Sequence, residues 1–129
     1  MLRRSFLSML GFGVIAAPLV NLSAAEPSGA EAACIAECKK CAKECATCIQ
    51  CCKEEGHKGC ALCPTCEKMC LVCAALCESE SPLSKDACKL CEQVCLACAK
   101  GCRAAGSDCC KACAERCEKC AAACKACHS

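Results

Sequence analysis

Cysteine is the residue type in this chain that could carry chemistry, because 25 of the 129 residues are cysteine. Twenty-two of them follow one another at intervals that alternate between three and four residues. Such a repeat places every member on one face of an α-helix, so we call these residues the cysteine seam. The seam consists of four runs: Cys34, Cys38, Cys41, Cys45, Cys48 and Cys52; Cys63, Cys66, Cys70, Cys73 and Cys77; Cys88, Cys91, Cys95, Cys98 and Cys102; and Cys110, Cys113, Cys117, Cys120, Cys124 and Cys127. The three cysteines outside the seam are Cys51, Cys60 and Cys109.

The spacing within the seam suits a soft metal ion better than a disulfide within one helix. Cysteines four residues apart on a helix have Cβ atoms about 5–6 Å apart, whereas a disulfide requires about 3.5–4.5 Å. Two thiolates at the longer spacing can hold one ion between them, and Cu(I) prefers sulfur and accepts about two or three ligands. We therefore predict that the chain binds multiple Cu(I) ions, ~12 to 25 of them. All 25 cysteines are candidate ligands.

Three other interpretations of the cysteines remain open from the sequence. Disulfides between helices could build a structural module, although the number of cysteines is odd. A zinc cluster of the metallothionein type requires closed sets of four ligands, and metallothionein chains lack a helical repeat. The run from Cys60 to Cys70 matches the iron–sulfur spacing of redox ferredoxins, but Leu71 stands where that motif has proline. Counting reduced thiols separates metal storage, which predicts roughly 25 free thiols, from a disulfide module, which predicts almost none.

Four helices must position the four runs, and the residues between the runs supply their starts and stops. Alanine, lysine, glutamate and leucine, which favour helices, fill the positions between the cysteines. Ser28 and Glu31 form a capping box before the first run, and Ser81 and Pro82 are expected to begin the third helix. We predict helices over about 29–54, 60–79, 82–104 and 108–127. Short connections make neighbours antiparallel, so the expected fold is all-α, an up-down-up-down four-helix bundle with a cysteine-lined core.

Residues 1–25 have the order of a secretory signal, with a charged start, an apolar stretch and small residues before Glu26. The adjacent Arg3 and Arg4 indicate the twin-arginine (Tat) route. We therefore expect export to the periplasm or another extracytoplasmic compartment, and a mature metal-binding domain over 26–129 without a membrane anchor. Removing Arg3 and Arg4 lowers Lys plus Arg from 16 to 14, which equals Asp plus Glu. A neutral chain without tryptophan or tyrosine gives no reason to expect nucleic acid as a partner.

The cysteines outside the seam all lie beside the first or the third connection between the predicted helices. In an up-down-up-down bundle these two connections share one end. Cys51, Cys60 and Cys109 would therefore collect there with His57, and we predict that this end is the mouth through which Cu(I) is loaded. No arrangement of residues in the sequence suggests a catalytic group, so we expect that the protein is not an enzyme.

The sequence resembles the bacterial copper storage proteins over residues 28–128, and the pair Arg3 and Arg4 makes it similar to their exported members. The resemblance implies a four-helix bundle whose core cysteines hold many Cu(I) ions for storage, homeostasis or detoxification. It also implies a homotetramer, and a copper chaperone or a cuproenzyme would then be a partner. Exported members carry several methionines at the open end of the bundle, whereas Met69 is the single methionine after residue 25. The likeness rests on C-x3-C pairs that begin at Cys34, Cys41, Cys48, Cys66, Cys73, Cys91, Cys98, Cys113 and Cys120.

Overall fold

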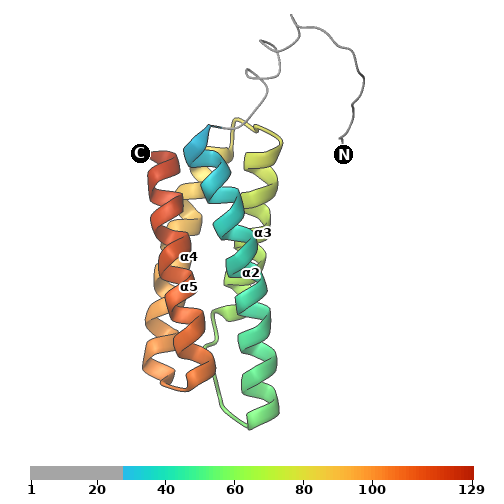
Figure 1. The fold of residues 1–129 in the computed structure, drawn as a ribbon, viewed down its shortest axis with the longest axis vertical. Coiled ribbons are helices and arrows are strands. Elements are labelled where there is room, and N and C mark those ends of the chain that lie inside the picture. Colours follow the sequence, from blue (N-terminus) through green and yellow to red (C-terminus); the bar gives the residue numbers. More distant parts are fainter. Residues whose placement is uncertain (1–27) are drawn as a thin grey trace, which may run out of the picture.

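A computed structural model describes residues 28–129, which form four α-helices joined by short connections. The helices are α2 (Gly29–Glu55), α3 (Cys63–Glu78), α4 (Ser84–Ala105) and α5 (Asp108–His128). Figure 1 shows them packed side by side, with α2 and α4 running in one direction and α3 and α5 in the other. The prediction of an all-α, up-down-up-down four-helix bundle is therefore confirmed. No helix within residues 28–129 is long and apolar enough to cross a membrane.

The ends of α2 are fixed by the residues that the sequence marks as its caps. The Glu31 N–H donates to Ser28 Oγ at 3.1 Å, and the Ser28 N–H donates to Glu31 Oε1 at 3.0 Å. This is the predicted capping box, and it satisfies two of the backbone donors that a helix start leaves free. At the other end Gly56 has a φ of 74°, a left-handed conformation that glycine adopts without a side-chain clash. Its N–H donates back to Cys52 and Lys53, which closes the last turn.

The second helix begins at Cys63, three residues later than we predicted. Pro64 lacks a backbone N–H and is tolerated only within the first turn of a helix, so it sets the start close to itself. Leu62 stands at the N-cap and offers no side-chain acceptor. The residues before it, 56–62, form an extended connection that crosses this end of the bundle (Figure 1).

The prediction that Ser81 caps the third helix is wrong by two residues. Helix α4 begins at Ser84, with Leu83 at the N-cap. The Ser81 hydroxyl accepts a hydrogen bond from the Leu83 N–H at 3.0 Å, and the Ser81 carbonyl accepts one from Ser84 at 3.0 Å. Serine side chains stabilise such tight turns by bonding to the backbone two residues later. The turn therefore takes up Ser81 and Pro82 before the helix starts.

No large aliphatic or aromatic side chain is fully buried in the part of the core that the structure describes. Among residues 28–129, the buried side chains are those of cysteine, alanine and one serine, Ser84. Leucines lie on the outside instead: Leu71, Leu90 and Leu96 are each 50% exposed. Thiols consequently occupy the volume that leucine or phenylalanine fills in an ordinary bundle. They contribute far less hydrophobic stabilisation per residue, because a cysteine side chain buries little apolar area.

Ion pairs join three of the four pairs of neighbouring helices on the outside. Lys39 of α2 contacts Glu78 of α3 at 2.6 Å, and Arg103 of α4 bonds both carboxylate oxygens of Glu118 of α5. Arg116 of α5 reaches Glu37 of α2 at 3.0 Å. Exposed pairs of this kind contribute only about 0–1 kcal/mol each, so they favour the observed pairing of helices without accounting for the stability of the bundle.

Helices α3 and α4 share no ion pair within the described part of the chain, and an apolar groove runs between them on the surface. The groove has a volume of about 500 Å³ and includes Met69, Val72, Leu76, Leu83 and Leu90. Met69 therefore lies in this groove, half-buried, and not among the thiols of the core.

Candidate metal centre

The cysteine seam forms a continuous network of sulfur atoms through the centre of the bundle. Every member of the seam is buried except Cys127, which is half-buried. Thiols on different helices lie 3.6–3.9 Å apart, as in the pairs Cys63–Cys102 (3.6 Å) and Cys38–Cys91 (3.9 Å). These separations allow weak S–H···S hydrogen bonds but are much longer than a disulfide bond of about 2.05 Å. The core is thus a set of closely spaced reduced thiols.

Buried alanines let the helices approach closely enough to bring these thiols together. Five of them directly follow a seam cysteine, and the sixth directly precedes one. A small residue at that position lets the neighbouring helix pack near the backbone, so sulfurs from opposite sides meet at the axis. We did not predict this role from the sequence, although the recurring Cys-Ala dipeptide is its signal. The residues are Ala42, Ala74, Ala87, Ala99, Ala114 and Ala121.

Groups of four thiols lie at distances that one metal ion could bridge. At least five such groups lie within residues 28–129, and in each of them all four sulfurs lie within 4.8 Å of one another. Cys38, Cys70, Cys91 and Cys120 form one group with a member from each of the four helices. The groups overlap, since Cys34 belongs to two of them. One thiolate can therefore bridge two ions, and the network is suited to many ions in contact.

Burial makes the thiols at both ends of the network harder to ionise. Removal from water is the largest cause of the raised pKa of Cys48, Cys88 and Cys102, and it raises the pKa of Cys77 to about 11. A low-dielectric core penalises each uncompensated thiolate. A bound cation removes that penalty, because coordination to a metal deprotonates a thiol outright. Hydrogen bonds from neighbouring thiols act in the opposite direction on Cys73 and lower its pKa to about 4. It is therefore at the two ends of the network that metal ions and thiolates must accumulate together.

Cys51 and Cys109, which we predicted as free thiols and candidate ligands, are joined to each other by a disulfide. Our expectation of 25 free thiols is therefore wrong for this pair, and 23 free cysteines remain. Both residues lie outside the seam, where the end of α2 meets the start of α5, and their Cα atoms are 6.0 Å apart. This separation lies within the range of about 4.4–6.8 Å that disulfides span between Cα atoms, so the two neighbouring helices can be bridged here.

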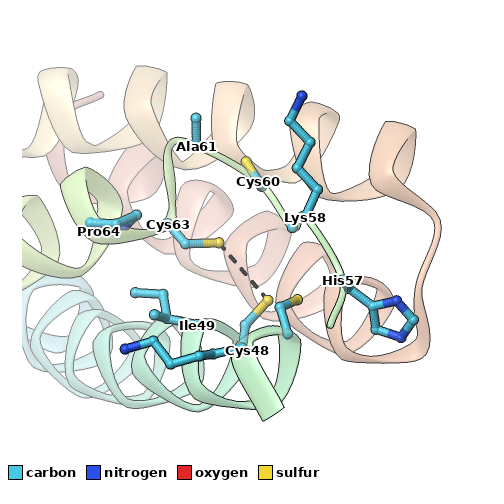
Figure 2. Close-up of a pocket in the computed structure, with 11 residues that line it drawn as sticks. Cys48, Ile49, His57, Lys58, Cys60, Ala61, Cys63 and Pro64 are labelled. Atoms are coloured by element: carbon cyan, nitrogen blue, oxygen red, sulfur yellow. Dashed lines mark hydrogen bonds between the residues drawn. The ribbon is translucent and has the colours of Figure 1, made fainter. Parts of the chain in front are cut away.

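Cys60 and His57 lie at the same end of the bundle as this disulfide. Cys60, which is half-buried, lines a cavity of about 290 Å³ together with Cys48, Cys52 and Cys63 (Figure 2). The structure thus brings one cysteine from outside the seam to the end of the thiol network. The ring of His57 points away from the sulfurs of Cys48 and Cys63 in Figure 2, and its Nε2 lies 3.2 Å from a carboxylate oxygen of Glu55. His57 lines the same cavity, but its ring forms no hydrogen bond to a thiol within residues 28–129.

The opposite end of the bundle is closed by a contact between a histidine and a glutamate. His128 Nε2 lies 2.6 Å from Glu92 Oε1, and both side chains are about four-fifths buried (19% and 20% exposed). This contact joins the last turn of α5 to α4 beside the half-buried Cys127.

Comparisons with known proteins agree on one family. Residues 28–129 match the family model described as "Copper storage protein". The structure of apo copper storage protein 3 from Bacillus subtilis is 35% identical and has a TM-score of 0.70, covering 75% of this chain and 97% of that one. The Cu(I)-bound copper storage protein BsCsp3 is 33% identical and has a TM-score of 0.73, covering 78% and 99%. No curated protein matches the chain.

Proposed function

The chain belongs to the copper storage protein family, and we propose that its store of copper serves homeostasis or detoxification in an extracytoplasmic compartment. The protein binds and stores multiple Cu(I) ions. The observation that carries this function is the unbroken network of thiols, 3.6–3.9 Å apart, along the whole core. We assign the 23 free cysteines as the ligands. A copper chaperone or a cuproenzyme would exchange copper with the protein.

The overlap of the thiol groups favours Cu(I) over zinc. A structural zinc site holds a closed set of four ligands at about 2.0–2.3 Å, and each ligand normally serves one ion. Cys41 and Cys66 belong together to two groups, with different partners in each. Such sharing suits ions that accept about two or three thiolates and bridge readily, as Cu(I) does.

Anaerobic titration of the reduced protein with Cu(I) against a chromophoric chelator tests the storage function. With 23 free thiols we expect ~12 to 23 ions per chain, from two thiolates per ion to fully bridged clusters. Zinc offered under the same conditions should fill far fewer positions. Binding of only one or two Cu(I) ions would contradict bulk copper storage. Binding of as many zinc ions as Cu(I) ions would contradict the preference for copper.

Export through the Tat route is the second part of the proposal. Its support is the pair Arg3 and Arg4 in a segment with the order of a secretory signal; residues 1–27 lie outside the part that the structure describes. Tat carries folded proteins, so the thiols could remain reduced before they meet an oxidising compartment. Replacing both arginines by lysine should retain the protein in the cytoplasm of a Tat-competent bacterium, measured by fractionation and immunoblot. Undiminished export of that variant would refute the route.

We also propose that the protein assembles as a homotetramer, with a second copy covering the apolar groove between α3 and α4. The support is the exposure of Val72 and Leu90 on that groove, at 51% and 50%. The variant Leu90→Glu should dissociate the oligomer in light-scattering chromatography. Leu96→Glu is a matched control, because Leu96 is equally exposed on the same helix but does not line the groove. A wild-type monomer, or dissociation by both variants alike, would rule out this interface.

A further inference from the structure

The cavity between the end of α2 and the connection 56–62 is a place where the thiol network reaches solvent. We call it the loop-end pocket; its walls include the thiols of Cys48, Cys52, Cys60 and Cys63 (Figure 2). Three of these belong to the seam and retain slight exposure, at 2% for Cys48, 5% for Cys52 and 1% for Cys63. All other buried members of the seam are 0% exposed. At this end of the bundle, the pocket is therefore the point at which an ion from outside can meet the buried sulfurs.

The pocket thiols are directly connected to the rest of the network. Cys63 lies 3.9 Å from Cys48, which is the pair joined in Figure 2, and 3.6 Å from Cys102. Cys52 lies 3.7 Å from Cys110. An ion held at the pocket can therefore move inward by exchanging one neighbouring thiolate at a time.

Two glycines leave room for Cys60 and the connection 56–62 to pack closely against the helices. A Cβ atom at Gly101 of α4 would lie 2.7 Å from Cys60 Sγ, so the glycine leaves the space that this sulfur occupies. A Cβ atom at Gly59 would lie 3.2 Å from Cys52 Sγ, and Gly59 has a φ of +73° that favours glycine. The connection thus packs tightly enough to place a half-buried thiol beside the end of the network.

The residues that line the pocket include two lysines and no carboxylate. Lys53 and Lys58 line it, and neither forms an ion pair within residues 28–129. Glu54 and Glu55 follow Lys53 in the sequence but do not line the pocket, and they bond to Gln50 and His57 respectively. Two lysines beside the opening would repel a bare Cu(I) cation and attract a negatively charged copper complex.

We propose that the loop-end pocket accepts Cu(I) from an anionic complex with two small-molecule thiolates; this rests on the storage function proposed above. Lys53 and Lys58 attract the complex, and Cys60 with Cys63 or Cys52 replaces its ligands. In the exchange, two Cu–S bonds to the donor break and two Cu–S bonds to the protein form. The protons of the two protein thiols move to the departing thiolates, which leave as neutral thiols. Copper stays Cu(I) throughout, so no oxidant or reductant takes part.

The charge requirement can be tested by stopped-flow measurement of Cu(I) uptake from two donors of opposite charge. The donors are the anionic Cu(I)–glutathione complex and the cationic Cu(I)–acetonitrile complex. The double variant Lys53→Gln/Lys58→Gln should take up copper from glutathione about tenfold more slowly at low ionic strength, and salt should remove the difference. Uptake from the acetonitrile complex should be unchanged or faster. Lys85→Gln/Lys89→Gln is the matched control, because it removes the same charge from the opposite end of the bundle, at the start of α4.

The thiol requirement is tested with Cys60→Ser, and with Ala61→Ser as a control that alters the next residue of the same connection and removes no thiol. We expect slower uptake from glutathione only for Cys60→Ser, and this variant should keep nearly the full capacity. Circular dichroism verifies that each variant retains its helices. Equal uptake rates for all variants at full capacity would overturn the pocket proposal alone. A wild-type capacity of one or two ions would instead overturn the storage function.

Discussion

Each seam cysteine fills space, forms weak hydrogen bonds and supplies a ligand, and these roles make different demands. As a neutral thiol it packs like a small apolar side chain, which lets the empty bundle fold around it. As a thiolate it becomes a strong ligand but carries a charge that the core does not tolerate alone. Cys77 illustrates the conflict, since its side chain is 0% exposed and its burial raises its pKa.

This conflict predicts how the stability of the empty, reduced protein depends on pH. The pKa of Cys77 rises from 9.0 to about 11 on folding because of burial. A raised pKa means that its contribution is complete below pH 9 and is lost as the pH rises towards 11. Cys48, Cys88 and Cys102 shift in the same direction for the same reason. Guanidinium unfolding should therefore show a lower midpoint at alkaline pH than at neutral pH.

The Cu(I)-loaded protein is the control for that measurement. Its thiolates are already deprotonated and compensated by bound ions, so its midpoint should change much less over the same pH range. An empty protein whose unfolding free energy stays constant from neutral to strongly alkaline pH would show that burial of these thiols has little energetic effect.

At the scale of the helices, the Cys51–Cys109 disulfide is the covalent link between α2 and α5. It closes a loop across a sequence separation of 58 residues. Restricting the unfolded chain in this way stabilises a fold by about 2–4 kcal/mol. The double variant Cys51→Ser/Cys109→Ser should lower the free energy of unfolding of the empty protein by that amount, measured by guanidinium titration without oxygen or reductant.

The same variant also shows whether these two sulfurs take part in storage. Since they are bonded to each other and lie outside the seam, its Cu(I) capacity should equal that of the wild type. A Cys60→Ser variant, which leaves the disulfide intact, is the control for loss of a thiol at this end. An unchanged unfolding midpoint together with a clearly lower capacity would mean that Cys51 and Cys109 act as ligands and not as a cross-link.

The helices and their inward faces could be predicted because one repeat determines both. Intervals that alternate between three and four residues over several turns indicate one face of an α-helix. The Ser28–Glu31 capping box could be predicted because its two residues are close together in the sequence. The start of α4 depends instead on how the Ser81 hydroxyl is used within a turn, which composition does not show. The disulfide depends on the surfaces that α2 and α5 turn towards each other. Both are properties of three-dimensional packing, so the seam pattern does not contain them.

At the scale of the whole molecule, copper and the fold must stabilise each other. The core buries thiols in place of large apolar side chains, so its hydrophobic stabilisation is small for its size. Ions that bind the folded thiol groups and not the open chain stabilise the fold by about 2.7 kcal/mol per site at a hundredfold excess over the dissociation constant. Loading several ions should raise the melting temperature by ~20 °C or more.

Differential scanning calorimetry of the empty and loaded protein, under anaerobic conditions, measures this effect. Removing the copper with a strong Cu(I) chelator should return the melting temperature to that of the empty protein, which controls for chemical damage to the thiols. Equal melting temperatures for the loaded and the empty protein would mean that the copper is bound outside the folded core.

The overlap of the thiol groups has a consequence for a partly filled core. Cys34 and Cys73 share two groups, and so do Cys41 and Cys66. A few ions can therefore be distributed over the sulfurs in many arrangements of similar energy. The configurational entropy of these arrangements is largest at intermediate filling and disappears when every thiolate is in use. The apparent affinity must then decline gradually as ions are added, even if all Cu–S bonds are equally strong. A protein of this design buffers free Cu(I) over a range of concentrations and not at one dissociation constant.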